Sequence, residues 1–175
     1  MIRPAKDSDL DAIEAAYDEH FAFEAAHPDK AFTVFRKGVY PTRHDAEKAL
    51  ACGGLTVYEE AGEILASVIT SQVQPPEYAD VPWQRTLADD EVRVIHLLMV
   101  RPGVSGRGIG TALLAHLEAQ ARDEGIAALR LDTGSQNLPA VHLYEKNGYR
   151  IVHRAAMKVG GVVPHEGHLF LEKSL

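Results

Sequence analysis

The feature that most restricts the fold of this chain is an apolar run, a glycine-rich turn and an amphipathic helix in direct succession. The run from Val92 to Val100 is almost continuously apolar, which predicts a central strand. A turn rich in glycine follows from Gly103 to Gly110, and apolar residues then recur three to four apart as far as Gly125. A strand that leads in this way into a helix predicts an α/β domain.

The turn is also the strongest indication of a binding site. Backbone amides at the start of a helix have no partner within the helix, and the helix dipole places partial positive charge there, which favours phosphate. Glycines allow that backbone to approach phosphate oxygens closely, and Arg107 adds a positive charge. A second interpretation stays open, in which the glycines serve only the tight turn.

The other elements follow from periodicity and turn residues. The pattern predicts strands at residues 1–4, 55–59, 64–73, 128–131, 149–154 and 168–171, and helices that begin at 7–9, 41–42 and 137. The full order, βααβββαβαββ, predicts an α/β (α+β) fold with a mixed sheet and helices on both faces. A length of 175 residues suits a single domain over residues 1–175. Residues 74–90 form an irregular loop, whose Tyr78 and Trp83 are expected to pack on the body.

Composition narrows the classes of partner. Eighteen Lys and Arg against 25 Asp and Glu give a net charge of −7, which disfavours nucleic acid and anionic membranes and favours an amine-bearing partner. There is no apolar run long enough to span a bilayer, no apolar signal core and only one cysteine, Cys52, so we expect no membrane segment and a cytoplasmic protein. His165-x-x-His168 has metal-like spacing, but no further ligand pattern completes it, and we expect no metal.

Two familiar phosphate-binding patterns fit the turn poorly. A nucleoside-triphosphate P-loop needs Lys and then Ser or Thr after its last glycine, but Ile109 and Gly110 follow Gly108. A dinucleotide fingerprint needs a third glycine where this chain has Thr111, and too few strand–helix units follow. A dinucleotide-binding protein therefore stays only a remote alternative.

A third pattern fits. Val100-Arg101-Pro102, followed by Arg107-Gly108-Ile109-Gly110-Thr111-Ala112-Leu113-Leu114, resembles the acetyl-CoA pyrophosphate motif of the GCN5-related N-acetyltransferase (GNAT) superfamily. Further on, Leu131-Asp132-Thr133, Asn137, Ala140 and the run Leu143–Tyr149 resemble the second motif of that family. The resemblance is close over residues 92–154 and implies a GNAT-like, mostly antiparallel sheet. Ser105 departs from the family pattern, which usually has Gln or Arg there.

The resemblance implies acetyl-CoA as cosubstrate, with no metal, and direct attack of an amine on the thioester. In the family the main chain of the central strand, here Leu98, Met99 and Val100, pairs with the pantetheine arm. The other cofactor-binding residues that it implies are Ser105, Gly106, Arg107, Gly108, Ile109, Gly110, Thr111, Asn137, Ala140 and Tyr144. Positions 137, 140 and 144 share one helical face, where the small Ala140 leaves room for a slender chain. Tyr144 matches the family's usual proton donor to the departing thiolate.

The general base is not decided by the sequence. His96 comes first, because its ordinary pKa suits proton transfer near neutral pH and some family members carry a histidine on this strand. Glu91 at the start of the strand is the second candidate, and Asp132 at the end of the next strand is the third. Cys52 is disfavoured as a nucleophile, because neither histidine nor acid is patterned with it.

The acceptor is expected to be an amine on a small molecule, peptide or protein. It should enter past the N-terminal helices, the segment Phe35–Arg43 and the 74–90 loop. The sequence is also compatible with a homodimer. The alternative from another class is a non-catalytic CoA-binding sensor or interaction module on the same fold, which only a turnover assay separates from an enzyme.

Overall fold

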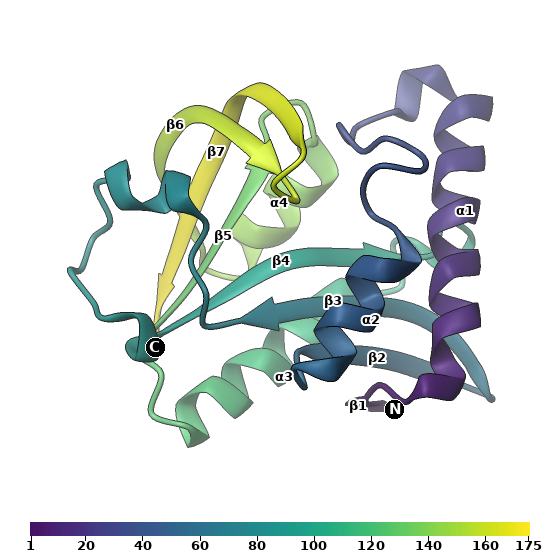
Figure 1. The fold of residues 1–175 in the computed structure, drawn as a ribbon, viewed down its shortest axis with the longest axis horizontal. Coiled ribbons are helices and arrows are strands. Elements are labelled where there is room, and N and C mark those ends of the chain that lie inside the picture. Colours follow the sequence, from purple (N-terminus) through teal and green to yellow (C-terminus); the bar gives the residue numbers. More distant parts are fainter.

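A computed structural model describes residues 1–175 and shows one seven-stranded sheet in the order β1-β2-β3-β4-β5-β7-β6 (Figure 1). All neighbouring strands are antiparallel except β4 and β5, which are parallel. The strands are β1 (Ile2–Pro4), β2 (Leu55–Glu60), β3 (Glu63–Ser71), β4 (Val92–Val100), β5 (Ala128–Gly134), β6 (Arg150–Val159) and β7 (Val163–Ser174). The predicted element order and the mixed, mostly antiparallel α/β class are confirmed.

Helices cover both faces of the sheet. α1 (Leu10–Ala26) and α2 (Arg43–Ala51) pack with Leu55, Leu97 and Met99 on one face. α3 (Ile109–Asp123) and α4 (Leu138–Lys146) pack with Ile95 and Leu129 on the other face (Figure 1). None of these helices has both the length and the apolar character that crossing a membrane requires.

The last two strands are longer than the sequence predicts. The predicted strand 149–154 covers the first half of β6, and the predicted strand 168–171 lies in the middle of β7. The two strands pair with each other as far as Val159 and Val163, around a tight turn at Gly160 and Gly161. The missed part contains Pro164 and several polar residues, which weaken a strand pattern. The two strands stabilise each other as a ribbon, and this pairing is not visible in either segment alone.

The sheet divides at its centre. β4 pairs with β5 only from Val92 to Ile95, and beyond that point β4 continues with β3 while β5 continues with β7. Ile69 pairs with Leu97 and Thr70 with Ile95, so His96 is an extra residue on β4, a β-bulge. Beyond the bulge, the side of β4 that faces β5 has no strand partner.

The 74–90 loop folds onto the outer end of β5 and β7. Tyr78 is fully buried, and Nε1 of Trp83 donates to the Tyr78 carbonyl at 2.9 Å. Both rings pack against Phe170 of β7. The prediction that these two aromatic residues pack on the body is confirmed.

A buried ion pair between β5 and β7 forms hydrogen bonds with this loop and holds it against the sheet. Nε of Arg130 lies 2.8 Å from Oε2 of Glu172, and the two side chains are 3% and 0% exposed. The other guanidinium nitrogens donate at 2.8 Å to Oε1 of Gln74 and to the carbonyl of Arg85. Oε1 of Glu172 accepts from the backbone amide of Gln84 at 3.0 Å. The pair thus forms hydrogen bonds with the first residue of the loop and with two residues in its second half.

Candidate active site

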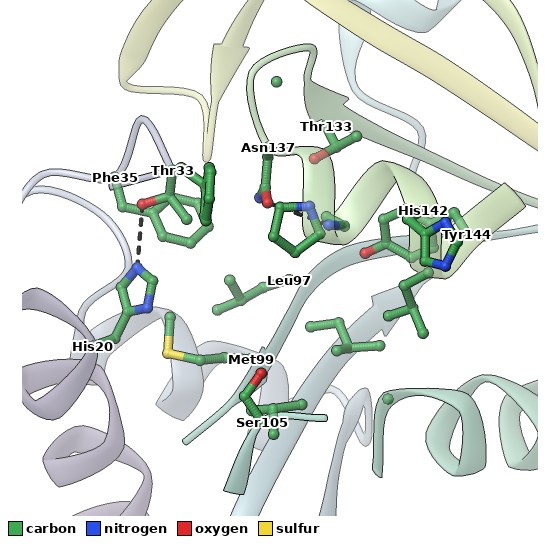
Figure 2. A pocket seen from close by; sticks show the side chains of 18 of the residues that line it. His20, Thr33, Phe35, Leu97, Met99, Ser105, Thr133, Asn137, His142 and Tyr144 are labelled. Atoms are coloured by element: carbon green, nitrogen blue, oxygen red, sulfur yellow. Dashed lines mark hydrogen bonds between the residues drawn. The ribbon is translucent and has the colours of Figure 1, made fainter. Parts of the chain in front are cut away.

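A pocket of about 830 Å³ opens where β4 and β5 diverge. The start of α3 and one face of α4 line one end, and the last turns of α1 with residues 30–35 line the other. In Figure 2, Leu97 and Met99 of β4 lie between His20 and Thr33 on one side and Tyr144 on the other. The pocket is therefore continuous from the glycine-rich turn to the N-terminal helix.

The turn before α3 presents a run of free backbone donors. The amide of Ser105 donates to the carbonyl of Pro102 at 3.2 Å, and that of Ala112 donates to Gly108 at 3.0 Å. Between them, the amides from Gly106 to Thr111 have no acceptor in the chain. Gly106 and Gly108 reach this shape with φ of 84° and 80°, which residues with a Cβ rarely adopt. Free amides and the positive end of the helix dipole together favour an anion here.

Another glycine of the turn joins it to α4. A Cβ on Gly110 would lie 2.9 Å from Cδ2 of Leu143, so a larger residue there would require the Leu143 side chain to shift. The two sequence motifs are therefore in direct contact.

One face of α4 is turned toward the pocket. Asn137 caps the helix, because its Oδ1 accepts from the amide of Ala140 at 3.3 Å. Tyr144 lies one turn beyond Ala140 and is 7% exposed, and its hydroxyl is directed into the pocket (Figure 2). Burial first, and the negative charge of Asp132 second, raise the pKa of Tyr144 well above its ordinary value. The hydroxyl therefore keeps its proton at neutral pH.

The structure brings together nearly all of the predicted cofactor-binding residues. Those that line the pocket are Leu98, Met99, Val100, Ser105, Gly106, Gly108, Ile109, Gly110, Thr111, Asn137, Ala140 and Tyr144. Arg107 does not line it: its side chain is exposed and forms an ion pair with Glu60 at 2.6 Å. Cys52 is exposed at the end of α2, also outside the pocket.

Two of the three candidate bases line the pocket, and Glu91 does not. Glu91 is exposed at the opposite end of β4, where its carboxylate accepts from the amide of Ala88 at 2.9 Å. His96 lies at the bulge with Nε2 2.7 Å from Oγ of Ser71, and burial lowers its pKa to about 4. Asp132 follows the last β4–β5 pair, and burial raises its pKa to about 6.

The acceptor end is formed by different segments than the sequence suggests. Of residues 35–43 only Phe35 lines the pocket, and the 74–90 loop contributes no residue to it. Instead, residues 30–34 close this end, because Glu24 accepts from both the amide and the hydroxyl of Thr33 at 2.9 Å. His20 also contacts Thr33, with Nε2 3.2 Å from Oγ1 (Figure 2). The spacing of His20 and Glu24, one helical turn apart, is the only signal of this arrangement in the sequence.

His168, for which the sequence indicates no functional role, also lines the pocket. It is 2% exposed, with Nε2 3.5 Å from Oδ2 of Asp132, and Oδ1 of Asp132 accepts from the hydroxyl of Tyr78 at 2.8 Å. The carboxylate of Asp132, with a pKa of about 6, and the hydroxyl of Tyr144 thus share one pocket with the free amides before α3. Such a site can hold a phosphate-bearing ligand and move protons beside it.

Comparisons with known proteins agree with this geometry. A family model described as acetyltransferase (GNAT) family matches residues 12–149. A mycothiol acetyltransferase from Cellulomonas flavigena is 34% identical over 96 residues, which are 55% of this chain and 26% of that protein. A streptothricin acetyltransferase from Streptomyces lavendulae is 33% identical over 67 residues, which are 38% of this chain and 32% of that protein. The chain therefore spans about a third or less of these curated relatives.

The likeness to a solved structure extends over the whole chain. An acetyltransferase of the GNAT family from Streptococcus agalactiae has a TM-score of 0.79 to this structure and 20% sequence identity. The match covers 100% of this chain and 95% of that chain. At this level of identity the likeness concerns the fold.

Proposed function

Because the chain belongs to the acetyltransferase (GNAT) family, we propose that it is an enzyme that transfers the acetyl group of acetyl-CoA to an amine. The observation that carries this proposal is the run of free amides from Gly106 to Thr111, which opens into the same pocket as the Tyr144 hydroxyl. The amides suit a pyrophosphate, and the hydroxyl suits a departing thiolate. A simple tight turn would require neither the pocket nor the hydroxyl.

The side of β4 that has no strand partner offers a binding position for the pantetheine arm. Beyond His96 this side has lost its strand partner, and Leu98, Met99 and Val100 line the pocket. An arm with amide groups can pair with such an edge as another strand would. A main-chain amide here would also donate to the thioester oxygen as negative charge develops on it; a comparable donor contributes about 3–4 kcal/mol in other enzymes.

Asp132 is the base that the chemistry favours. An alkylamine arrives as an ammonium ion, so one proton must leave before attack and a second after the new C–N bond has formed. A base is most effective when its pKa lies near the working pH, and burial raises the pKa of Asp132 to about 6. The lowered pKa of His96, about 4, makes it a weaker base, and its Nε2 is already engaged by Ser71.

The acceptor end of the pocket suits a cationic amine. Glu24 and Asp132 both line the pocket, and neither is paired with a Lys or Arg side chain. Burial lowers the pKa of the neighbouring His20 and His168, so these imidazoles are neutral near pH 7 and do not offset the two carboxylate charges. The net charge of −7 on the whole chain also favours a cationic acceptor.

The decisive experiment is a panel of amines assayed for thiol release from acetyl-CoA. We expect release that depends on both substrates, with cationic alkylamines preferred over neutral aromatic amines. Binding of acetyl-CoA without thiol release for any amine would favour the CoA-binding sensor and contradict the enzyme. Stabilisation by NAD but not by acetyl-CoA would contradict both interpretations.

Substitution of Gly108 by alanine tests the anion site. Gly108→Ala is expected to weaken acetyl-CoA binding about tenfold, measured by calorimetry, because a residue with a Cβ disfavours the φ of 80° that aims the amides.

The matched control for Gly108→Ala is Gly125→Ala, at the other end of α3. Gly125 has a φ of 76° and, like Gly108, has no atom within 4 Å of an added Cβ. Both variants carry similar backbone strain, so Gly125→Ala should lower the melting temperature to a similar extent and leave acetyl-CoA affinity unchanged. Equal affinity losses in the two variants would mean that the amides before α3 do not bind the cofactor.

A further inference from the structure

A β-bulge in β7 brings two histidines to one face of the β6–β7 ribbon. His168 pairs with Ala155 and His165 pairs with Met157, so β7 contains one residue more than β6 between these pairs. Gly167 lies within this stretch with a φ of 75°, the conformation of a glycine bulge. Residues three apart on a regular strand point to opposite faces, but the extra residue turns both imidazoles to the same face.

The two imidazoles continue a chain of polar contacts that begins in the pocket. Oδ2 of Asp132 lies 3.5 Å from Nε2 of His168. Nδ1 of His168 in turn lies 2.7 Å from Nδ1 of His165. His168 is buried, whereas His165 is partly exposed on the ribbon. The contacts therefore lead from the carboxylate in the pocket to the surface.

We propose that His168 and His165 form a proton relay that carries a proton from Asp132 to the solvent. The inference rests on the proposed acetylation, because the reaction of an ammonium ion with a thioester releases one net proton. Nε2 of His168 accepts the proton from Oδ2 of Asp132, and the proton on Nδ1 of His168 passes to Nδ1 of His165. Nε2 of His165 then releases a proton to water. One proton enters the chain and one leaves it, and Asp132 is again a carboxylate. The transfer leaves each imidazole as its other tautomer, and proton exchange with water restores the first tautomers before the next turnover.

The charges around the relay are compatible with this direction of transfer. The titratable groups that face Asp132 and His168 are His165 on β7, Tyr144 on α4, Tyr40, and Tyr78 with Glu77 on the turn Pro76–Asp80. No Lys or Arg is among them, so Asp132 has no fixed cation that would hold it ionised. Burial and then the neighbouring His165 lower the pKa of His168 to about 4, so His168 holds an added proton only briefly.

The test replaces each relay histidine and asks whether a diffusible base restores turnover. In His165→Gln and His168→Gln, we expect kcat to fall about tenfold, with KM for acetyl-CoA and for the amine unchanged. Added imidazole should restore most of the kcat of His165→Gln, and kcat should become dependent on buffer concentration. The wild type should show neither response, and its kcat/KM should rise with pH through about 6 as Asp132 ionises.

His153→Gln is the matched control. His153 lies on β6 in the same ribbon, packs against Phe170 and does not line the pocket, so its kcat and imidazole response should equal those of the wild type. A wild-type kcat in both relay variants, or a loss that imidazole does not restore in either, would overturn the relay. A pH titration followed by NMR gives a second test. If the chemical shifts of the His165 ring nitrogens do not change as Asp132 titrates, the relay is also overturned. Absence of thiol release by the wild type with every amine would instead overturn the proposed function.

Discussion

Tyr144→Phe is expected to lower kcat about 100-fold while leaving acetyl-CoA affinity unchanged, because only the proton for the departing thiolate is removed. The ring of Tyr144 belongs to the core that α3 and α4 share, and phenylalanine preserves that packing. The measurements are steady-state kinetics of thiol release and calorimetric titration with acetyl-CoA. A fall in affinity equal to the fall in kcat would show that the hydroxyl binds the cofactor and does not act as the acid.

The proximity of Asp132 gives this prediction a pH component. The charge on Asp132 contributes to the raised pKa of Tyr144. In the proposed reaction the relay removes the first amine proton before attack, and Asp132 takes up the second after the C–N bond has formed. Uptake of this second proton makes Tyr144 a stronger acid when the C–S bond breaks, and the proton then passes to the tyrosinate. Asp132→Asn removes both the proposed base and this change in charge. The kcat/KM of this variant should therefore not rise with pH through about 6, as that of the wild type should.

Tyr149→Phe is the matched control for Tyr144→Phe. The two rings lie edge to face with centroids 5.7 Å apart, but the hydroxyl of Tyr149 is buried and has no hydrogen-bond partner. Its removal should leave kcat unchanged, and because an unpartnered buried hydroxyl is costly, it should not lower the free energy of unfolding. A similar loss of kcat in both variants would point to packing and would contradict an acid role for Tyr144.

Glu172→Gln is expected to lower the free energy of unfolding by about 3–5 kcal/mol, because it leaves the buried Arg130 without its counter-charge. Glutamine also offers one acceptor oxygen where Glu172 uses two, one for Arg130 and one for the amide of Gln84. Urea unfolding followed by circular dichroism measures the change. Proteolysis of the native protein should shift to the 74–90 loop, which this ion pair fastens.

Glu124→Gln is the control for that substitution. Glu124 pairs with Arg93, but its side chain is 53% exposed, and exposed pairs contribute at most about 1 kcal/mol. A loss for Glu172→Gln that is no larger than the loss for Glu124→Gln would mean that the buried pair does not stabilise the loop.

The sequence predicts the parts of this protein that depend on local chemistry. Gly108 marks the turn before α3 because only glycine readily adopts its backbone conformation. Asn137 marks the start of α4 because its side chain caps the helix. The order of elements follows from such signals, and so does the placement of nearly all predicted cofactor-binding residues in one pocket.

The parts that could not be predicted depend on pairing between distant segments. Glu91 comes just before β4 and Asp132 lies in the second half of β5, and the parallel register of the two strands places Asp132 at the pocket and Glu91 at the opposite end. His165 and His168 meet because β7 contains an extra residue relative to β6. Their spacing in the sequence predicts opposite faces of a strand. The closure of the acceptor end by Thr33 likewise depends on contacts with α1.

The side of β4 that has no strand partner beyond His96 has a consequence for aggregation. Unpaired strand edges are sites where other chains add on and aggregation begins, and proteins usually shield them with charge, proline or short strands. Here the unpaired hydrogen-bonding groups lie inside a pocket walled by α4 and by residues 30–35. The protein can therefore keep an edge open for a narrow ligand without offering it to a neighbouring molecule.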